Sequence, residues 1–302
     1  FTNMTRGHRC CGAAKISVDN FADYQHKLRK ARVIIDRNER KRLIQEEAQK
    51  LADAKKLRLR EDEALLEEVA GLVEWPNILM GSIDEEFMEV PSEALISAMR
   101  SHQKYFSLET LDGSLAPYFI TVSNMPSDST RDARIIVGNA KVLRARLSDA
   151  RFFWDQDLKS KLDERVPALS KINFFDKLGS LGDKSERLQK LVPTICEFIG
   201  LDNVNGAVKA ARLAKADLST MMVNEFPELQ GVMGGYYANA DGEPPEVCRA
   251  ISGHYAPLGP TDACPSEPLT ITISIADKID TLVGFFAINE KPTGSKDPFA
   301  LR

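Results

Sequence analysis

Residues 138–154 read GNAKVLRARLSDARFFW, and they predict an amphipathic helix. Apolar side chains recur at steps of three or four and share one face of this helix: Leu143, Leu147, Ala150 and Trp154. Polar side chains at the same steps share a second face: Lys141, Arg144, Ser148 and Arg151. One face is therefore expected to pack against the core, and the other is cationic.

The cationic face allows two interpretations. Lys141, Arg144 and Arg151, flanked by Arg146, could neutralise phosphates along a nucleic-acid backbone, with an affinity that falls steeply with salt. Alternatively, these side chains form ion pairs with acidic residues that are close in sequence: Asp149, Asp155 or Asp157. Spacing alone leaves both interpretations open.

A highly charged helical segment precedes this helix, from about residue 36 to residue 74. Between Asp36 and Glu68 there is no glycine or proline, which predicts one long helix or a helical pair. A helix is expected from Pro91-Ser92, and a turn signal at residues 111–114 predicts a hairpin. The expected strands are Ile78–Met80, Phe87–Val90, Lys104–Leu108 and Tyr118–Val122. Residues 1–172 are therefore expected to form an α+β domain.

The remaining residues, 173–302, show a helical pattern as far as Asn289. It is interrupted at Gly200, at Gly231–Gly235 and in the proline-containing loop 257–268. The predicted fold class is thus α+β, with a mixed N-terminal domain followed by an all-helical domain.

Composition limits the class of protein. The 302 residues are 43% hydrophobic and carry a formal net charge of -4, so a sizeable core is possible and a broadly cationic nucleic-acid binder is excluded. Five cysteines without a CxxC pair predict a reducing compartment and no zinc site. Apolar stretches are far shorter than the roughly 20 residues that a bilayer crossing needs, so we expect a soluble protein that does not bind a membrane.

A second basic and aromatic cluster spans Arg100 to Phe106. Arg100 and Lys104, together with the aromatic rings, would suit contacts to phosphates and stacking on unpaired bases. The alternative is structural: His102 caps the preceding helix, and strand alternation buries Phe106 and exposes Tyr105.

Recognisable catalytic motifs are absent. The sequence contains no GxGxxG, P-loop, GxSxG or HExxH motif, and its four histidines are scattered. Charged residues on two expected helical stretches remain as candidates: Lys215, Asp217, Asp277 and Asp280. Carboxylates on packed helices can hold a metal ion, but more often they cap helices or pair with lysines such as Lys278. No catalytic residue and no metal ligand is assigned.

Several motifs, taken together, resemble one family. They are EWP (74–76), FMEVP (87–91), SHQKYF (101–106), GNAKVLRARLSDARFF (138–153), KLGSL with DK (177–184), AKADL (214–218), EFPELQGVMG (225–234), ADKIDTL (276–282) and PTGSKDPFALR (292–302). In this order they are similar to the beta subunit of the bacterial-type glycyl-tRNA synthetase, which also occurs as the beta portion of fused chains in plant organelles. The resemblance extends from about Glu74 to the last residue.

The resemblance implies a non-catalytic part of a class II glycine-tRNA ligase. In that family the alpha subunit, or alpha portion, uses ATP, Mg²⁺ and glycine, while the beta part grips tRNA-Gly and scaffolds the oligomer. We therefore expect no cofactor in this segment, a location in the bacterial cytoplasm, plastid stroma or mitochondrial matrix, and a chain that lacks the family's C-terminal anticodon-binding region. The expected tRNA-binding residues are Lys141, Arg144, Arg146, Arg151, Lys104 and Arg100.

The helical half resembles the HD-type domain of this family. Ala216-Asp217 stands where an active HD phosphohydrolase has His-Asp, and Asp277 stands for its later aspartate, so the metal site is expected to be degenerate. The alternatives are an HD-type metal-dependent phosphohydrolase that uses Asp217 and Asp277, and a purely structural module that docks the alpha subunit.

Overall fold

A computed structural model describes residues 3–11, 15–259, 261–294, 296–297 and 301. Two compact units divide the chain, Phe1–Arg151 and Phe152–Arg302. The division lies within a long helix and not near residue 172, because the last residues of that helix, from Phe152, belong to the second unit. Among the described residues, no helix combines the length and apolar character that a bilayer crossing requires.

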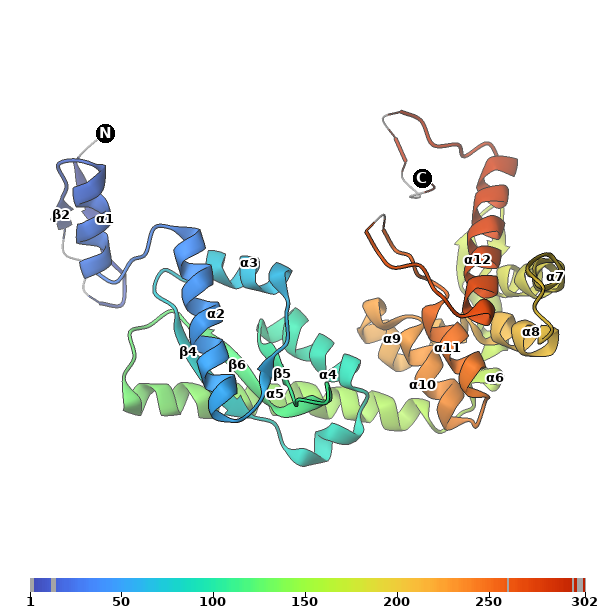
Figure 1. Ribbon diagram of the computed structural model, residues 1–302, viewed down its shortest axis with the longest axis horizontal. Coiled ribbons are helices and arrows are strands. Elements are labelled where there is room, and N and C mark those ends of the chain that lie inside the picture. The colour runs from blue at the N-terminus through green and yellow to red at the C-terminus, as the bar shows by residue number, and fades with distance from the viewer. Residues whose placement is uncertain (1–2, 12–14, 260, 295, 298–300, 302) are drawn as a thin grey trace. The chain divides into compact units, whose positions relative to one another are not determined.

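The first unit begins with a small hairpin and a helical pair (Figure 1). The elements are β1 (Met4–Arg6), β2 (Lys15–Ser17), α1 (Phe21–Lys30), α2 (Arg37–Ala54), β3 (Arg58–Leu59) and α3 (Glu63–Leu72). The expected helical segment is thus a pair of helices separated by a two-residue strand. Asp36 and Asp62 cap α2 and α3, because each carboxylate accepts a backbone N–H from the first turn.

A four-stranded antiparallel sheet forms the centre of this unit, in the order β3-β5-β6-β4. Its other strands are β4 (Asn77–Ser82), β5 (Phe106–Glu109) and β6 (Leu115–Ser123). Ile120 of β6 lies opposite Met80 on one side and Phe106 on the other. Apolar side chains of α2 and α3, among them Ile44, Leu65 and Val69, pack against the sheet in one core. The predicted hairpin between β5 and β6 is confirmed.

The connections between strands differ partly from expectation. The prediction of a strand at Phe87–Val90 is wrong: residues Glu85–Glu89 form a 3₁₀ helix, η1, which buries Phe87. The expected helix after Pro91 is confirmed as α4 (Ser92–Ala98), and it continues as a π-helical turn, η2 (Met99–Gln103).

The helix expected at 138–154 is α5, which runs from Ser129 to Asp157. It begins nine residues earlier than Gly138 because Asp128 provides the cap: its Oδ1 accepts the N–H of Arg131 at 2.8 Å. The expected apolar face is buried at Leu143, Leu147 and Ala150.

Asp157, the last residue of α5, is buried among hydrogen-bond donors of the second unit. Its carboxylate accepts the backbone N–H groups of Met221 (3.0 Å) and Met222 (2.9 Å) and the hydroxyl of Tyr237 (3.0 Å), and it pairs with Arg165 (3.2 Å). Asp157 is thus not a partner of the cationic helix face.

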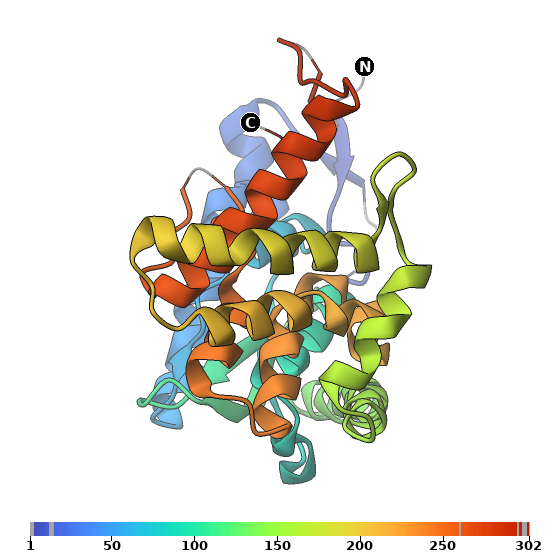
Figure 2. The ribbon, with the colours of Figure 1, turned by 90° about the vertical axis from the view of Figure 1, so that its right-hand side faces the viewer.

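The second unit is mainly helical. Its elements are α6 (Leu162–Arg165), η3 (Val166–Lys171), β7 (Asn173–Phe175), β8 (Gly179–Ser180), α7 (Leu181–Ile199), α8 (Val204–Leu213), η4 (Ala216–Ser219), α9 (Met221–Glu225), η5 (Pro227–Leu229), α10 (Val232–Ala240), α11 (Pro245–Gly253) and α12 (Pro268–Ala287). Helices α7 and α8 lie side by side, and α12 packs against both (Figure 2).

The prediction of an all-helical second domain is wrong in one respect. Strands β7 and β8 form a short antiparallel hairpin before α7. Its turn requires Gly179, whose φ is +83°, and Ser180 then caps α7. Helical periodicity does not detect so short a pair of strands.

Candidate functional site

The cationic face of α5 is partly neutralised by the acidic turn η1 and the residue before it. Arg144 makes a bidentate ion pair with Asp84, at 2.7 and 2.9 Å. Arg151 pairs with Glu86 at 2.9 Å and with Glu89 at 3.5 Å. These carboxylates lie about 60 positions before the arginines in sequence. They are not the nearby residues Asp149, Asp155 or Asp157, which the sequence offered as partners.

Lys141 and Arg146 of the same helix differ from these two arginines. Both side chains are exposed, and among the described residues neither makes a hydrogen bond or an ion pair. The helix therefore presents two exposed unpaired cations together with two paired arginines, which a phosphate backbone could approach from solvent.

The second predicted cluster is ion-paired. Lys104 pairs with Glu68 at 2.8 Å, and Arg100 pairs with Asp62, the cap of α3, at 2.6 Å. These contacts hold the π-helical turn against α3. Exposed ion pairs of this kind contribute only about 0–1 kcal/mol, so a phosphate can replace the carboxylate at small cost.

Tyr105 is not available for stacking on a base. The expectation that it is exposed is wrong: its ring is 3% exposed and stacks on Phe119, with the ring centroids 4.8 Å apart. The residue precedes β5, and Lys104 before it has a φ of +56°, so strand alternation does not apply. The hydroxyl donates to Asn139 of α5 at 2.7 Å, and burial raises the pKa of Tyr105 to about 12.

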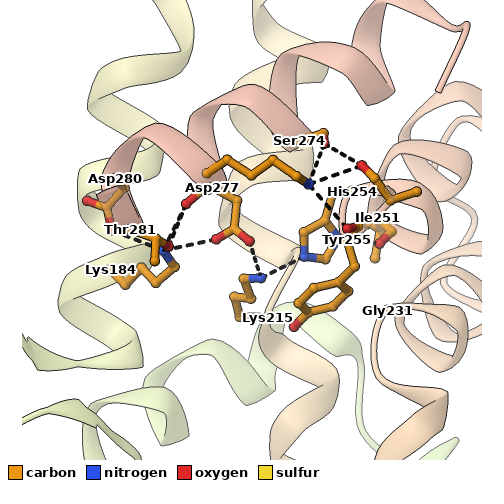
Figure 3. A network of polar contacts seen from close by, with 12 residues as sticks. Lys184, Lys215, Gly231, Ile251, His254, Tyr255, Ser274, Asp277, Asp280 and Thr281 are labelled. Atoms are coloured by element: carbon orange, nitrogen blue, oxygen red, sulfur yellow. Dashed lines mark hydrogen bonds and ion pairs between the residues drawn. The ribbon is translucent and has the colours of Figure 1, made fainter. Parts of the chain in front are cut away.

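A buried cluster of charged residues occupies the second unit (Figure 3). Lys215 follows α8, and its Nζ lies 2.8 Å from His254 Nε2 and 3.0 Å from Asp277 Oδ2 of α12. The same ammonium group lies 3.8 Å from the centroid of the Tyr255 ring. Burial lowers the pKa of Lys215 to about 8, a value that keeps the ammonium form predominant at neutral pH.

A second lysine holds the other side of Asp277. Lys184 of α7 lies 3.0 Å from Asp277 Oδ1 and 3.0 Å from Asp280 Oδ2, and it donates to Thr281 at 2.8 Å. Burial acts to raise the pKa of Asp277, but the ammonium groups of Lys215 and Lys184 outweigh it and hold that pKa well below its usual range. Asp277 is therefore an ionised bridge between two buried lysines.

Asp217 lies in a cradle of backbone N–H groups. Its Oδ2 accepts from Gly231 at 2.5 Å and from Gly234 at 3.1 Å, whereas burial raises its pKa to about 6. Gly231 has a φ of +82°, and a Cβ there would lie 2.8 Å from Tyr255 Cδ2. The GVMG motif at 231–234 thus supplies donors to a buried carboxylate.

The structure gives the residues of the expected degenerate metal site different partners. Ala216 and Asp217 are buried, and the side chain of Asp277 is 13% exposed; Asp277 binds lysines, whereas Asp217 binds backbone amides. The suggested partner Lys278 instead donates to the carbonyls of Tyr255 and Ala256. In the part of the chain that the structure describes, no group of three or more His, Cys, Asp or Glu side chains could hold a metal ion.

Two members of the cluster were missed. His254 is one of four histidines scattered along the sequence, and Lys184 stands at the end of the motif at 177–184. The available signal was the combination of basic and acidic residues within otherwise apolar helices, which requires ion pairing when such helices are packed.

Comparison with known proteins gives a consistent result. The sequence profile described as "Glycyl-tRNA synthetase beta subunit" matches residues 1–302. The chain is 53% identical over 306 residues to the glycine–tRNA ligase beta subunit of Rhodospirillum centenum, covering 100% of this chain and 42% of that protein. It is 48% identical over 304 residues to that of Cereibacter sphaeroides (99% and 43%) and 49% identical over 303 residues to that of Dinoroseobacter shibae (99% and 42%). The chain thus spans less than half the length of these relatives.

Proposed function

Because the chain belongs to the glycyl-tRNA synthetase beta subunit family, we propose that it is the tRNA-holding and scaffolding part of a glycine–tRNA ligase. The observation that carries the proposal beyond the family is the solvent-facing pair Lys141 and Arg146 on α5, without partners among the described residues. We propose the alpha subunit, or alpha portion, as the partner in which ATP, Mg²⁺ and glycine react.

The proposed mechanism is positioning. Lys141 and Arg146 contact the phosphate backbone first, since they have no internal partner to lose. Arg144 and Arg151 follow by exchanging Asp84 and Glu86 for phosphates, and Arg100 and Lys104 form a second contact patch in the same way. Contacts to phosphates fix the orientation of a nucleic acid without reading its sequence, so they would hold the 3′ end of tRNA-Gly for reaction on the partner.

The second unit has a supporting role in this proposal. We propose that it is an HD-like helical scaffold whose buried charges are used for packing, since Lys215 and Lys184 occupy both oxygens of Asp277. With an ammonium group 3.0 Å from each of its carboxylate oxygens, Asp277 is poorly placed to bind a metal ion for hydrolysis.

Binding of the chain to tRNA-Gly across a salt titration tests the proposal. The double charge reversal Lys141→Glu with Arg146→Glu should weaken binding at least about tenfold near 0.1 M salt and make the salt dependence shallower. The matched control reverses Lys171 and Lys190, which are also exposed, and should have a smaller effect.

Three outcomes would contradict the proposal. Equal losses in the two double variants would mean that only net charge matters, and unchanged affinity after reversal of Lys141 and Arg146 would remove α5 from the tRNA contact. Retained binding to the alpha subunit without tRNA binding would favour a purely structural docking module. Conversely, Asp84→Asn with Glu86→Gln should strengthen tRNA binding, since it removes the carboxylate partner of Arg144 and one of the two carboxylate partners of Arg151.

A further inference from the structure

Two adjacent thiols lie beside a buried histidine in the first unit. His8 follows β1 and is 1% exposed, whereas Cys10 and Cys11 are both exposed. Backbone hydrogen bonds hold this turn, since the N–H of His8 donates to the carbonyl of Ala31 at 2.9 Å and the N–H of Cys11 donates to the carbonyl of His8 at 2.9 Å. A thiol that solvent can reach is thus held next to an imidazole that solvent cannot reach.

The hydrogen bonds of the His8 ring define where its proton lies. Its Nδ1 accepts the backbone N–H of Cys10 at 3.3 Å. A backbone N–H can only donate, so in the neutral ring Nδ1 has the lone pair and Nε2 carries the proton. The same Nδ1 lies 3.6 Å from Cys11 Sγ. The thiol of Cys11 therefore faces a nitrogen that can accept its proton.

A carboxylate lies on the opposite side of the ring. His8 Nε2 is buried and has no hydrogen-bond partner among the described residues, but Glu74 Oε2 lies 4.0 Å from it. The Glu74 side chain is 53% exposed, so it acts on the ring through a partly screened charge. A thiol, an imidazole and a carboxylate in this order form the arrangement that activates a nucleophilic cysteine.

Space for a reagent lies next to these groups. Cys10 and Glu74 line a surface cavity of about 850 Å³, together with apolar side chains that include Leu28 and Val33. A small molecule can therefore approach the thiols without displacing packed side chains.

We propose that Cys11, His8 and Glu74 form an activated-thiol site at which small electrophiles modify this chain covalently. Cys11 Sγ attacks the electrophilic carbon and forms an S–C bond, and the leaving group departs with the electron pair of the bond that breaks. The thiol proton passes to His8 Nδ1, and the imidazolium then releases a proton to solvent. Glu74 is a positioning residue that acts through His8. The proposal concerns the first unit and is independent of tRNA binding.

Iodoacetamide is the probe, because peptide mass spectrometry locates each alkylated cysteine. A free thiol is only a few per cent ionised at pH 7, so proton transfer to His8 increases the reactive fraction, although a more readily formed thiolate is a weaker nucleophile. In the unsubstituted chain at pH 7, Cys11 should therefore react at least about threefold faster than Cys10 and the exposed Cys264. Equal rates at Cys10 and Cys11 would overturn the proposal.

His8→Asn separates the chemical role of the ring from its structural role. The asparagine side-chain oxygen can accept the N–H of Cys10, but it cannot take a proton from the thiol. The alkylation rate of Cys11 should fall at least about threefold, while the rates at Cys10 and Cys264 stay unchanged. An unchanged Cys11 rate in a folded variant would overturn the proposal.

Glu74→Gln tests the carboxylate. It should lower the Cys11 rate by about twofold at low salt, and this difference should disappear near 0.5 M salt because the charge is partly exposed to solvent. A rate equal to that of the unsubstituted chain at low salt would contradict the role of Glu74.

A measurement on the unsubstituted chain needs no variant to fold. Near-ultraviolet circular dichroism monitors the folded state, and the ratio of the Cys11 rate to the Cys10 rate is compared with and without concentrated guanidinium chloride. Preference for Cys11 that is lost on unfolding supports the proposal, because the contacts of His8 exist only in the fold. A preference that persists in the unfolded chain would come from the local sequence and would overturn it.

Discussion

Replacement of Asp157 by alanine should destabilise the second unit far more than its position at the end of a helix suggests. The side chain is 1% exposed and is an ion-pair partner of Arg165 as well as an acceptor for Met221, Met222 and Tyr237. Alanine removes all four contacts. It leaves the buried N–H of Met222 and the buried hydroxyl of Tyr237 without their acceptor.

The magnitude follows from the uncompensated partners. Removing one member of a buried, hydrogen-bonded ion pair costs about 3–5 kcal/mol, most of it from the groups left without a partner. For a unit of this size, each kcal/mol lowers Tm by about 2–4 °C, so the expected decrease in Tm is about 6–20 °C. The Tm of Asp157→Asn should lie between that of the unsubstituted chain and that of Asp157→Ala, since the amide keeps the shape of the side chain but replaces one acceptor with a donor.

Urea denaturation followed by circular dichroism gives the free energy of unfolding, and a thermal scan gives Tm. Asp149→Ala is the matched control, because Asp149 is exposed on the same helix and should change stability by less than about 0.5 kcal/mol. A loss below about 1 kcal/mol for Asp157→Ala, with the control unchanged, would refute the reasoning that these contacts stabilise the second unit.

Three further predictions concern other parts of the chain. Tyr105→Phe should lower the free energy of unfolding by about 1–3 kcal/mol, because Asn139 loses a buried donor, and an unchanged urea midpoint would contradict this. Gly231→Ala should cost about 1–3 kcal/mol or more in the same assay, since φ is positive and the new Cβ would meet Tyr255; a stabilised variant would show that the cradle is not tight. Burial lowers the pKa of His254 to about 3, below its unfolded value of about 6.5. The contribution of the neutral ring to stability is therefore complete above pH 6.5. It is lost as the pH falls towards 3, by about 1.4 kcal/mol per pH unit. Comparison with His254→Gln between pH 7.5 and 5 isolates this effect, and parallel stability curves for the two chains would rule it out.

Local periodicity predicted the parts of the fold that depend on neighbouring residues. The buried face of α5 at Leu143 and Leu147 and the hairpin of β5 and β6 are of this kind, because each follows from side-chain spacing or a turn signal. Local periodicity did not predict the 3₁₀ turn at Phe87 or the burial of Tyr105, since both depend on backbone conformations that strand alternation does not encode.

The contacts of the candidate sites depend on pairings across long sequence distances. Arg144 was identified as an exposed cation, but its partner Asp84 lies 60 positions away, and no local pattern distinguishes it from Asp149. The contacts of the buried cluster depend even more on the fold, because Lys215 contacts His254 and Asp277 only after three separate segments have packed. The sequence could therefore identify charged candidates, whereas their partners required the fold.

The lysine–carboxylate cluster also constrains how this sequence can diverge. Loss of Lys215, Lys184 or Asp277 alone leaves a buried charge uncompensated, whereas joint replacement by apolar residues of similar volume can be neutral or stabilising. Such positions show strong epistasis, so the effect of one substitution depends on which residue already occupies the others. Drift at these sites is therefore expected to proceed through paired changes, and a homologue that has lost one lysine should carry a compensating change at Asp277 or Asp280.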